Sequence, residues 1–261
     1  MRVALFSTCI GDAMFPDASK ATALLLSRLG YEVVFPEKQT CCGQMHVNTG
    51  YQKEAVGMIE NYVDAFEDDS IDFVVSPSGS CVGAVREQHE HVAKRYGKAG
   101  LADGAAKAAK KTLDLPEFLI DVAGVENVGA FFPHKVTYHP SCHGLRFLKL
   151  GDRPYRLLQN VEGLELLDLP NKEECCGFGG TFSLKNAETS AAMVSDKCRN
   201  IENTGAEYIT GGDSSCLMNI VGALSRQHVG IRAIHLAEIL ASTKEHPWTP
   251  TSAAYSKEAM L

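Results

Sequence analysis

Short apolar runs alternate along the chain with longer segments in which apolar residues recur at helical spacing. In the first half, the pattern predicts strands at 3–7, 32–35 and 73–76 and helices at 18–29, 51–66 and 83–96. In the second half, it predicts strands at 135–138, 165–169 and 207–210 and helices at 154–161 and 187–203. Strands that are apolar throughout and separated by helices are typical of parallel sheets covered on both faces. We therefore expect an α/β fold with two similar, Rossmann-like lobes.

Cysteines recur at nearly the same spacing in the two halves. In the first half, thirty-one residues separate Cys9 from the Cys41-Cys42-Gly43 motif, and thirty-eight residues separate Cys42 from Cys81. In the second half, thirty-two residues separate Cys142 from the Cys175-Cys176-Gly177 motif, and thirty-nine residues separate Cys176 from Cys216. Equivalent cysteines are 133, 134, 134 and 135 positions apart. So regular a repeat indicates a duplicated unit.

The duplication sets the expected domain boundaries: a first lobe at 1–133, a second at 134–242 and a tail at 243–261. The segments 115–119 and 236–240 also resemble each other, but at an offset of 121, so the first half has about fourteen extra residues. The stretch 96–111 is rich in Ala, Gly and Lys, and is expected to be this surface insertion or exposed helix. The tail has no periodicity and is expected to be flexible or to dock on a partner.

The repeated cysteines all follow predicted strands, and these positions meet at the carboxyl edge of a parallel sheet. Helix amino termini point their N–H groups into a site at that edge, which lowers thiol pKa values and suits an anionic iron–sulfur cluster. Gly43 and Gly177 are expected to let the backbone pass close to the metal, since glycine tolerates positive φ. The expected metal ligands are Cys9, Cys41, Cys42, Cys81, Cys142, Cys175, Cys176 and Cys216.

Other interpretations of the cysteines stay open. Four thiolates satisfy a 4Fe–4S cluster and would equally satisfy tetrahedral zinc. A thiol–disulfide enzyme that uses an adjacent cysteine pair is less favoured, because such chemistry does not need two distant cysteines per half. The ninth cysteine, Cys198, has no repeat partner and joins Val194 and Ile201 at helical spacing, so we expect it to be a core residue.

Composition excludes several classes of function. The 261 residues carry 32 acidic and 25 basic side chains, a formal charge of −7 that argues against binding to nucleic acid or to an anionic membrane surface. No apolar run approaches the roughly 18 to 20 residues of a membrane span, and no signal-peptide pattern precedes the first strand. We expect a cytoplasmic protein, where nine cysteines are more typical of metal binding or catalysis than of disulfides.

The doubled cysteine pattern resembles the cysteine-rich CCG domain family. The segments that carry the likeness are 139–144, 175–180 and 211–216, which read HPSCHG, CCGFGG and GGDSSC. The likeness is nearest to the lactate-utilisation members and more distant to the CCG-containing subunit of heterodisulfide reductase. It implies an iron–sulfur oxidoreductase subunit with one 4Fe–4S cluster per lobe, transferring electrons in bacterial oxidation of L-lactate or a related 2-hydroxy acid. It also implies partners of the lactate-utilisation B and C type or another redox subunit.

Resemblance to the more distant relative implies a heterodisulfide-type reductase subunit as an alternative function. The chain differs from that relative in one feature of the cysteine pattern. In that protein the last cysteine belongs to a Cys-x-x-Cys pair, which gives five thiolates per site. Ser78 and Asp213 occupy the first position of that pair here, so five-thiolate ligation is not available. This departure keeps a zinc-binding structural or assembly module as a further alternative. Asp213 either supplies an oxygen ligand or caps the helix near Cys216, and we favour the cap.

Two histidines flank the first cysteine of the second motif. His139 and His143 either orient a cysteine ligand or carry a proton, or they pack as ordinary loop residues. No Walker loop, dinucleotide-binding fingerprint or ferredoxin-type cysteine run is found in the sequence. A redox partner is therefore expected to supply the remaining chemistry.

Overall fold

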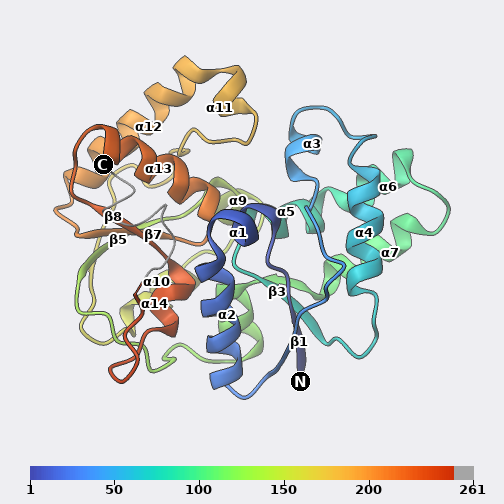
Figure 1. Cartoon of the computed structure of the whole chain (residues 1–261), viewed down its shortest axis with the longest axis horizontal. Coiled ribbons are helices and arrows are strands. Elements are labelled where there is room, and N and C mark those ends of the chain that lie inside the picture. Colours follow the sequence, from blue (N-terminus) through green and yellow to red (C-terminus); the bar gives the residue numbers. More distant parts are fainter. Residues whose placement is uncertain (250–261) are drawn as a thin grey trace.

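Two parallel four-stranded sheets of the same topology form the centre of the molecule, a computed structural model described over residues 1–249 (Figure 1). The strand orders are β2-β1-β3-β4 and β6-β5-β7-β8. This finding confirms the prediction of an α/β fold with two Rossmann-like lobes. The strands are β1 Arg2–Leu5, β2 Glu32–Val34, β3 Phe73–Ser76, β4 Thr112–Asp114, β5 Lys135–His139, β6 Glu165–Leu167, β7 Tyr208–Gly211 and β8 Arg232–His235.

The register of the two sheets repeats as closely as the cysteines do. Val3 of β1 pairs with Val33 and Phe73, and Val136 of β5 pairs with Leu166 and Tyr208. The central strands are buried except at their first residues, because helices cover both faces of each sheet. A repeated register places equivalent loops at the same edge of each sheet.

Helices connect the strands in both halves. The helix α2 begins with Pro16, which suits a first turn, and is followed by Gly30 at φ +87°, a conformation that glycine adopts readily after the end of a helix. The helices of the first half are α1 Cys9–Met14, α2 Pro16–Arg28, α3 Gln44–Asn48, α4 Val56–Phe66, α5 Gly79–Glu87, α6 His89–Tyr96, α7 Leu101–Lys111 and α8 Leu115–Glu117, with a π-helical turn at Phe118–Val122. Those of the second half are α9 Cys142–Arg146, α10 Arg153–Gln159, α11 Phe182–Lys185, α12 Ala187–Glu202, α13 Ser214–Arg226 and α14 Leu236–Ala241.

The last helix of each half crosses to the other half. α14 packs against α2, beside which it lies in Figure 1, and α8 packs against α10. Arg28, at the end of α2, donates to the carbonyls of Leu240 and Ala241 (2.7 and 2.8 Å), which the end of α14 leaves without helical partners. One apolar cluster includes Val3 and Leu25 together with residues of the second half. The two sheets therefore share a core and form one body.

The structure corrects several element predictions. Each sheet has a fourth strand that the apolar pattern does not predict, because β4 is only three residues long and β8 begins with a charged residue. The segment predicted as one helix at 83–96 is two helices, which meet at Gln88, and the first begins earlier, at Gly79. The helix predicted at 51–66 begins at Val56.

The predicted insertion at 96–111 contains α7. Its Leu101, Ala105 and Ala108 are buried, and the helix packs against α4 and α6. The opposite face carries lysines, which is typical of an amphipathic helix on a protein surface. α7 is thus a half-buried part of the first lobe rather than an exposed helix.

The described part of the tail lies against its own chain. The Trp248 indole N–H donates to Oε2 of Glu238 in α14 (2.9 Å), and the Trp248 amide donates to Ser242 Oγ (3.1 Å). Residues 250–261, where the prediction of a flexible or partner-docking tail also falls, lie outside the described residues. Within residues 1–249, no helix has the length and apolar character needed to cross a bilayer.

Candidate metal centre

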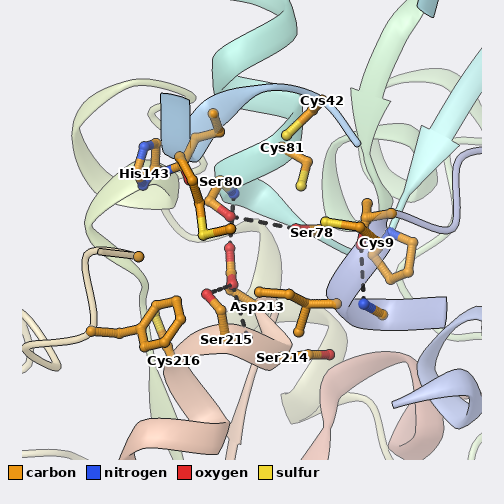
Figure 2. Close-up of a pocket in the computed structure, with 18 of the residues that line it drawn as sticks. Cys9, Cys42, Ser78, Ser80, Cys81, His143, Asp213, Ser214, Ser215 and Cys216 are labelled. Carbon is orange, nitrogen blue, oxygen red and sulfur yellow. Dashed lines mark hydrogen bonds between the residues drawn. The ribbon is translucent and has the colours of Figure 1, made fainter. Parts of the chain in front are cut away.

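One cleft between the two halves contains all eight repeated cysteines. The cleft lies at the carboxyl edges of both sheets, and Figure 2 shows residues of both halves converging on it. All nine cysteines of the chain are free thiols. The cysteines that line the cleft are Cys9, Cys41, Cys42, Cys81, Cys142, Cys175, Cys176 and Cys216.

The first cysteine of each motif begins a short helix. Cys9 starts α1 and Cys142 starts α9. The preceding hydroxyls cap these helices: Thr8 Oγ1 and Ser141 Oγ each accept from a backbone N–H in the first turn, at 3.4 and 3.1 Å. Gly11 makes the first cap possible, since a Cβ there would lie 2.9 Å from Thr8 Oγ1. The cap fixes where the chain turns, and therefore where the cysteine enters the cleft.

The glycine of each Cys-Cys-Gly motif turns its N–H onto a thiol. Gly43 (φ +78°) donates to Cys41 Sγ at 3.4 Å, and Gly177 (φ +84°) donates to Cys175 Sγ at the same distance. Positive φ is the conformation that favours glycine, as expected from the sequence. Gly177 also lies against α12, where a Cβ would come 2.8 Å from the carbonyl oxygen of Ser190.

The last cysteine of each motif lies in the first turn of a helix. Cys81 is the third residue of α5 and Cys216 the third residue of α13. The sequence predicts a loop at Cys81, because apolar periodicity becomes evident only beyond it. Both cysteines therefore enter the cleft at a helix amino terminus, where backbone N–H groups without helical partners would stabilise an anionic metal group.

Within each half the four thiols form a connected series. Cys9 Sγ lies 3.5 Å from Cys41 Sγ. Hydrogen bonds from Cys42 and then Cys9 lower the pKa of the Cys41 thiol, and hydrogen bonds from Cys142 and then Cys176 lower the pKa of the Cys175 thiol. One central thiolate in each half is thus surrounded by donors. An arrangement that concentrates negative charge on sulfur suits a bound metal cation.

Asp213 joins the two halves at the centre of the cleft, as Figure 2 shows. Its Oδ1 accepts from the Ser215 amide (3.2 Å) and caps α13, which confirms the predicted cap. Its Oδ2 accepts from the amide of Ser80 in α5 (2.8 Å). The backbones of Asp213 and its repeat equivalent Ser78 also form an antiparallel bridge. One carboxylate thus holds the two helices that carry Cys81 and Cys216.

The two predicted histidines have different surroundings. His143 Nδ1 lies 3.6 Å from Cys142 Sγ, and its ring stacks on Phe147. His139 is 1% exposed, and neither ring nitrogen has a hydrogen-bond partner among residues 1–249. Burial lowers the pKa of His139 to about 4, with a further contribution from Lys197, so the imidazole is neutral at neutral pH. A neutral imidazole is available as a metal ligand.

Three residues that shape the cysteine loops were missed in the sequence. Lys197 in α12 is fully buried, and its ammonium donates to the carbonyl of Asn171 (2.9 Å), in the loop that leads to Cys175. Its signal was present, since Lys197 lies three residues after Val194 and four before Ile201, on the apolar side of the helix. His89 contacts the carbonyl oxygen of Cys42, and Asn219 donates to that of Cys176, both at 2.8 Å. His89 and Asn219 are not at equivalent positions of the repeat, so no sequence pattern points to them.

Cys198 lies apart from the cleft. It is fully buried in α12 among apolar residues of the second lobe, with Sγ 3.7 Å from the carbonyl oxygen of Ile220. This confirms the prediction that Cys198 is a core residue. The nine cysteines therefore divide into eight in the cleft and one in the core.

Comparison with known proteins agrees with the repeat. The cysteine-rich domain named CCG matches residues 3–86 and 136–221, which include all eight cysteines of the cleft. A match to the solved structure of an ABC transporter periplasmic solute binding protein from Actinobacillus succinogenes covers all of this chain and 83% of that protein's chain, but with 11% identity and a TM-score of 0.30. Likeness at that level carries no argument.

The chain also matches curated proteins over nearly its whole length. Lactate utilization protein A of Oceanobacillus iheyensis is 45% identical over 94% of this chain and 98% of its own. The proteins of the same name from Geobacillus kaustophilus and Bacillus subtilis are 47% and 46% identical, over 92% and 93% of this chain and 98% and 100% of their own. The chain therefore belongs to the cysteine-rich CCG domain family, carries the domain once in each half, and falls within that family beside the lactate utilization A proteins.

Proposed function

We propose that this protein is the iron–sulfur electron-transfer subunit of a bacterial system that oxidises L-lactate or a related 2-hydroxy acid. The observation that carries the proposal is the gathering of eight thiols, four from each half, in a single cleft. The shared name of its relatives supports the role in lactate utilisation. The donor set fits the cofactor, since four thiolates hold a 4Fe–4S cluster and N–H donors to sulfur stabilise its negative charge.

The chain's own residues hold and tune such a site. The thiolates of each half would bind iron, and the Gly43 and Gly177 amides would donate to the sulfurs of Cys41 and Cys175. When bound, a 4Fe–4S cluster supplies one-electron oxidation and reduction. Asp213 fixes the two helix amino termini relative to each other, and so fixes the separation of the two cysteine sets. Two sites in one cleft suit a relay of single electrons.

Oxidation of a 2-hydroxy acid removes two electrons and two protons, and residues 1–249 show no nucleotide-binding fingerprint to receive a hydride. We therefore infer that a partner carries the reaction at the organic acid. Partners of the lactate-utilisation B and C type, or another redox subunit, would exchange electrons with the cysteine sites.

Zinc binding is the second candidate, and one observation favours it. His139, Cys176 and Cys216 offer ligand atoms that all lie within 4.8 Å of one another, a spacing that suits a single ion. Tetrahedral zinc with mixed thiolate and imidazole ligands is a common structural site. The second half would then be an assembly module rather than a redox site.

Metal and sulfide analysis of protein purified without oxygen tests both functions. Two 4Fe–4S clusters predict about eight iron and eight sulfide per chain, together with an electron paramagnetic resonance signal on reduction. The Cys41→Ser and Cys175→Ser variants should each lose the content of one site, whereas Cys198→Ser, the matched control, should lose none. Protein that holds neither iron nor sulfide after reconstitution would contradict the proposal. Tightly held zinc that iron does not displace would favour the alternative.

A further inference from the structure

The two cysteine sites differ at the carboxyl end of the first strand of each half, where Phe6 directly follows β1 and His139 is the last residue of β5. Position 6 of the first half is equivalent to position 139 of the second, at the same offset of 133 that relates Cys9 to Cys142. Phe6 is fully buried and packs edge-on against the rings of Tyr62 and Phe66. The second half has His139 instead. The duplicated fold thus presents a hydrocarbon ring at one site and an imidazole at the other.

His139 has no structural role that would account for its polarity. A buried imidazole without hydrogen bonds destabilises the fold relative to one with its partners. Both ring nitrogens of His139 lack a hydrogen-bond partner among residues 1–249, and the side chain is 1% exposed. By contrast, the buried His89 bonds to a backbone carbonyl and His235 accepts a backbone N–H. A buried ring nitrogen without a hydrogen-bond partner has its lone pair available for a metal.

The imidazole is also within reach of the thiols. One of its nitrogens lies within 4.8 Å of the sulfurs of both Cys176 and Cys216, which themselves lie within that distance of each other. Among residues 1–249 no comparably compact group of three donors is found in the first half. Asp213, at the position where a fifth thiolate would stand, is already bonded to two backbone amides. His139 is the additional donor that the second half offers.

We propose that His139 is a direct nitrogen ligand of the metal group in the second site, so that this site is mixed thiolate and imidazole while the first is thiolate only. The proposal rests on metal binding at these cysteines, but it holds for an iron–sulfur cluster and for zinc alike. A neutral imidazole adds no negative charge. The second half also has the buried cation Lys197, whose repeat equivalent in the first half is the uncharged Val63. The second site would therefore be the more easily reduced of the two.

Cobalt(II) titration of the metal-free protein tests the ligand without requiring an iron–sulfur cluster. The variants are His139→Phe, which installs the first half's residue, and His139→Cys, which supplies a thiolate. His143→Phe is the matched control, because it removes an imidazole that touches Cys142 but that we do not expect to bind metal. We expect His139→Phe to weaken cobalt binding at one of two sites at least tenfold. His139→Cys should restore binding with the ligand-field bands moved to lower energy, since thiolate exerts a weaker field than imidazole.

A second measurement addresses the reconstituted protein. With ¹⁵N-labelled histidine, pulsed electron paramagnetic resonance should detect a nitrogen coupled to one reduced centre, lost in His139→Phe and kept in His143→Phe. Unchanged cobalt affinity in His139→Phe, or a nitrogen coupling that survives this substitution, would overturn the proposal. Urea unfolding of each metal-free variant distinguishes loss of a ligand from loss of the fold, and His139→Cys decides the matter if the Phe variant unfolds. If cobalt reports a nitrogen ligand but no cluster assembles, only the proposed electron-transfer function fails.

Discussion

The glycines of the two Cys-Cys-Gly motifs allow a matched test of how the cysteine loops are held. Both have positive φ, but their surroundings differ. A Cβ on Gly43 would meet side-chain atoms at 3.5 Å, which is ordinary contact. A Cβ on Gly177 would lie 2.8 Å from the backbone oxygen of Ser190 and 3.2 Å from Met193 Cβ, both in α12. Since a helix backbone does not yield easily, Gly177→Ala should be the more damaging substitution.

The magnitudes follow from the separate contributions. Placing alanine at positive φ costs roughly 1–2 kcal/mol, and about 0.4–1 kcal/mol of this is offset because alanine restricts the unfolded chain. Gly43→Ala should thus lower the free energy of unfolding by about 1 kcal/mol. Overpacking against a rigid neighbour adds about 1–3 kcal/mol, so Gly177→Ala should cost about 2–4 kcal/mol. Gly50→Ala is the control, with φ +89° and no atom within 4 Å of the added Cβ.

Urea unfolding of the metal-free, reduced proteins measures these differences, followed by circular dichroism and by fluorescence of Trp248, the only tryptophan. We expect Gly50→Ala and Gly43→Ala to shift the midpoint by similar small amounts and Gly177→Ala to shift it several times as far. If Gly177→Ala unfolds at the same urea concentration as Gly43→Ala, the contact with α12 does not hold the second loop, and the reasoning is wrong.

Four further predictions concern residues around the cleft and the shared core. Asp213→Ala removes an acceptor from two helix amino termini and should cost about 2–3 kcal/mol in urea unfolding, whereas Asp213→Asn, which keeps one acceptor oxygen, should cost less. Burial raises the pKa of Glu238 in the folded protein from an ordinary 4.5 to about 7, so stability present below pH 4.5 should be lost as pH rises through 7. This loss amounts to about 3 kcal/mol, and Glu238→Gln should remove it from a series of unfolding midpoints; an unchanged pH profile would show that Glu238 is not the group responsible. Cys198→Ala should lower stability by about 1 kcal/mol and leave the metal content unchanged; loss of metal would contradict its role as a core residue. Lys197→Met removes a buried cation near the second site and should lower the midpoint potential of one of two centres in a redox titration, while the exposed Lys185→Met should leave both potentials unchanged; equal effects of the two substitutions would refute the role of burial.

Much of the fold and of the candidate site was evident in the sequence, because both depend on local or repeated features. Apolar runs predict the three strands of each sheet that come first in the chain, since a strand buried on both faces must be apolar along its length. The offsets of 133 to 135 residues identify two equivalent sets of four cysteines without any structure. The position of Cys198 at helical spacing from Val194 and Ile201 predicts its burial, because helix geometry alone puts those three side chains on one face.

Only the tertiary structure decided how the two halves meet. The crossing of α8 and α14 joins the two halves in a shared core, with both cysteine sets in one cleft. The packing of α14 on α2 brings together residues more than 200 positions apart, such as Arg28 and Ala241, which are separated by 213 positions. The bond from Ser80 to Asp213 spans 133 residues, and no local pattern reports it. The sequence by itself determined that the two halves carry equivalent sets of four cysteines. The structure determined that they are unequal, since whether a buried His139 finds a hydrogen-bond partner or faces two thiols depends on what the rest of the fold places around it.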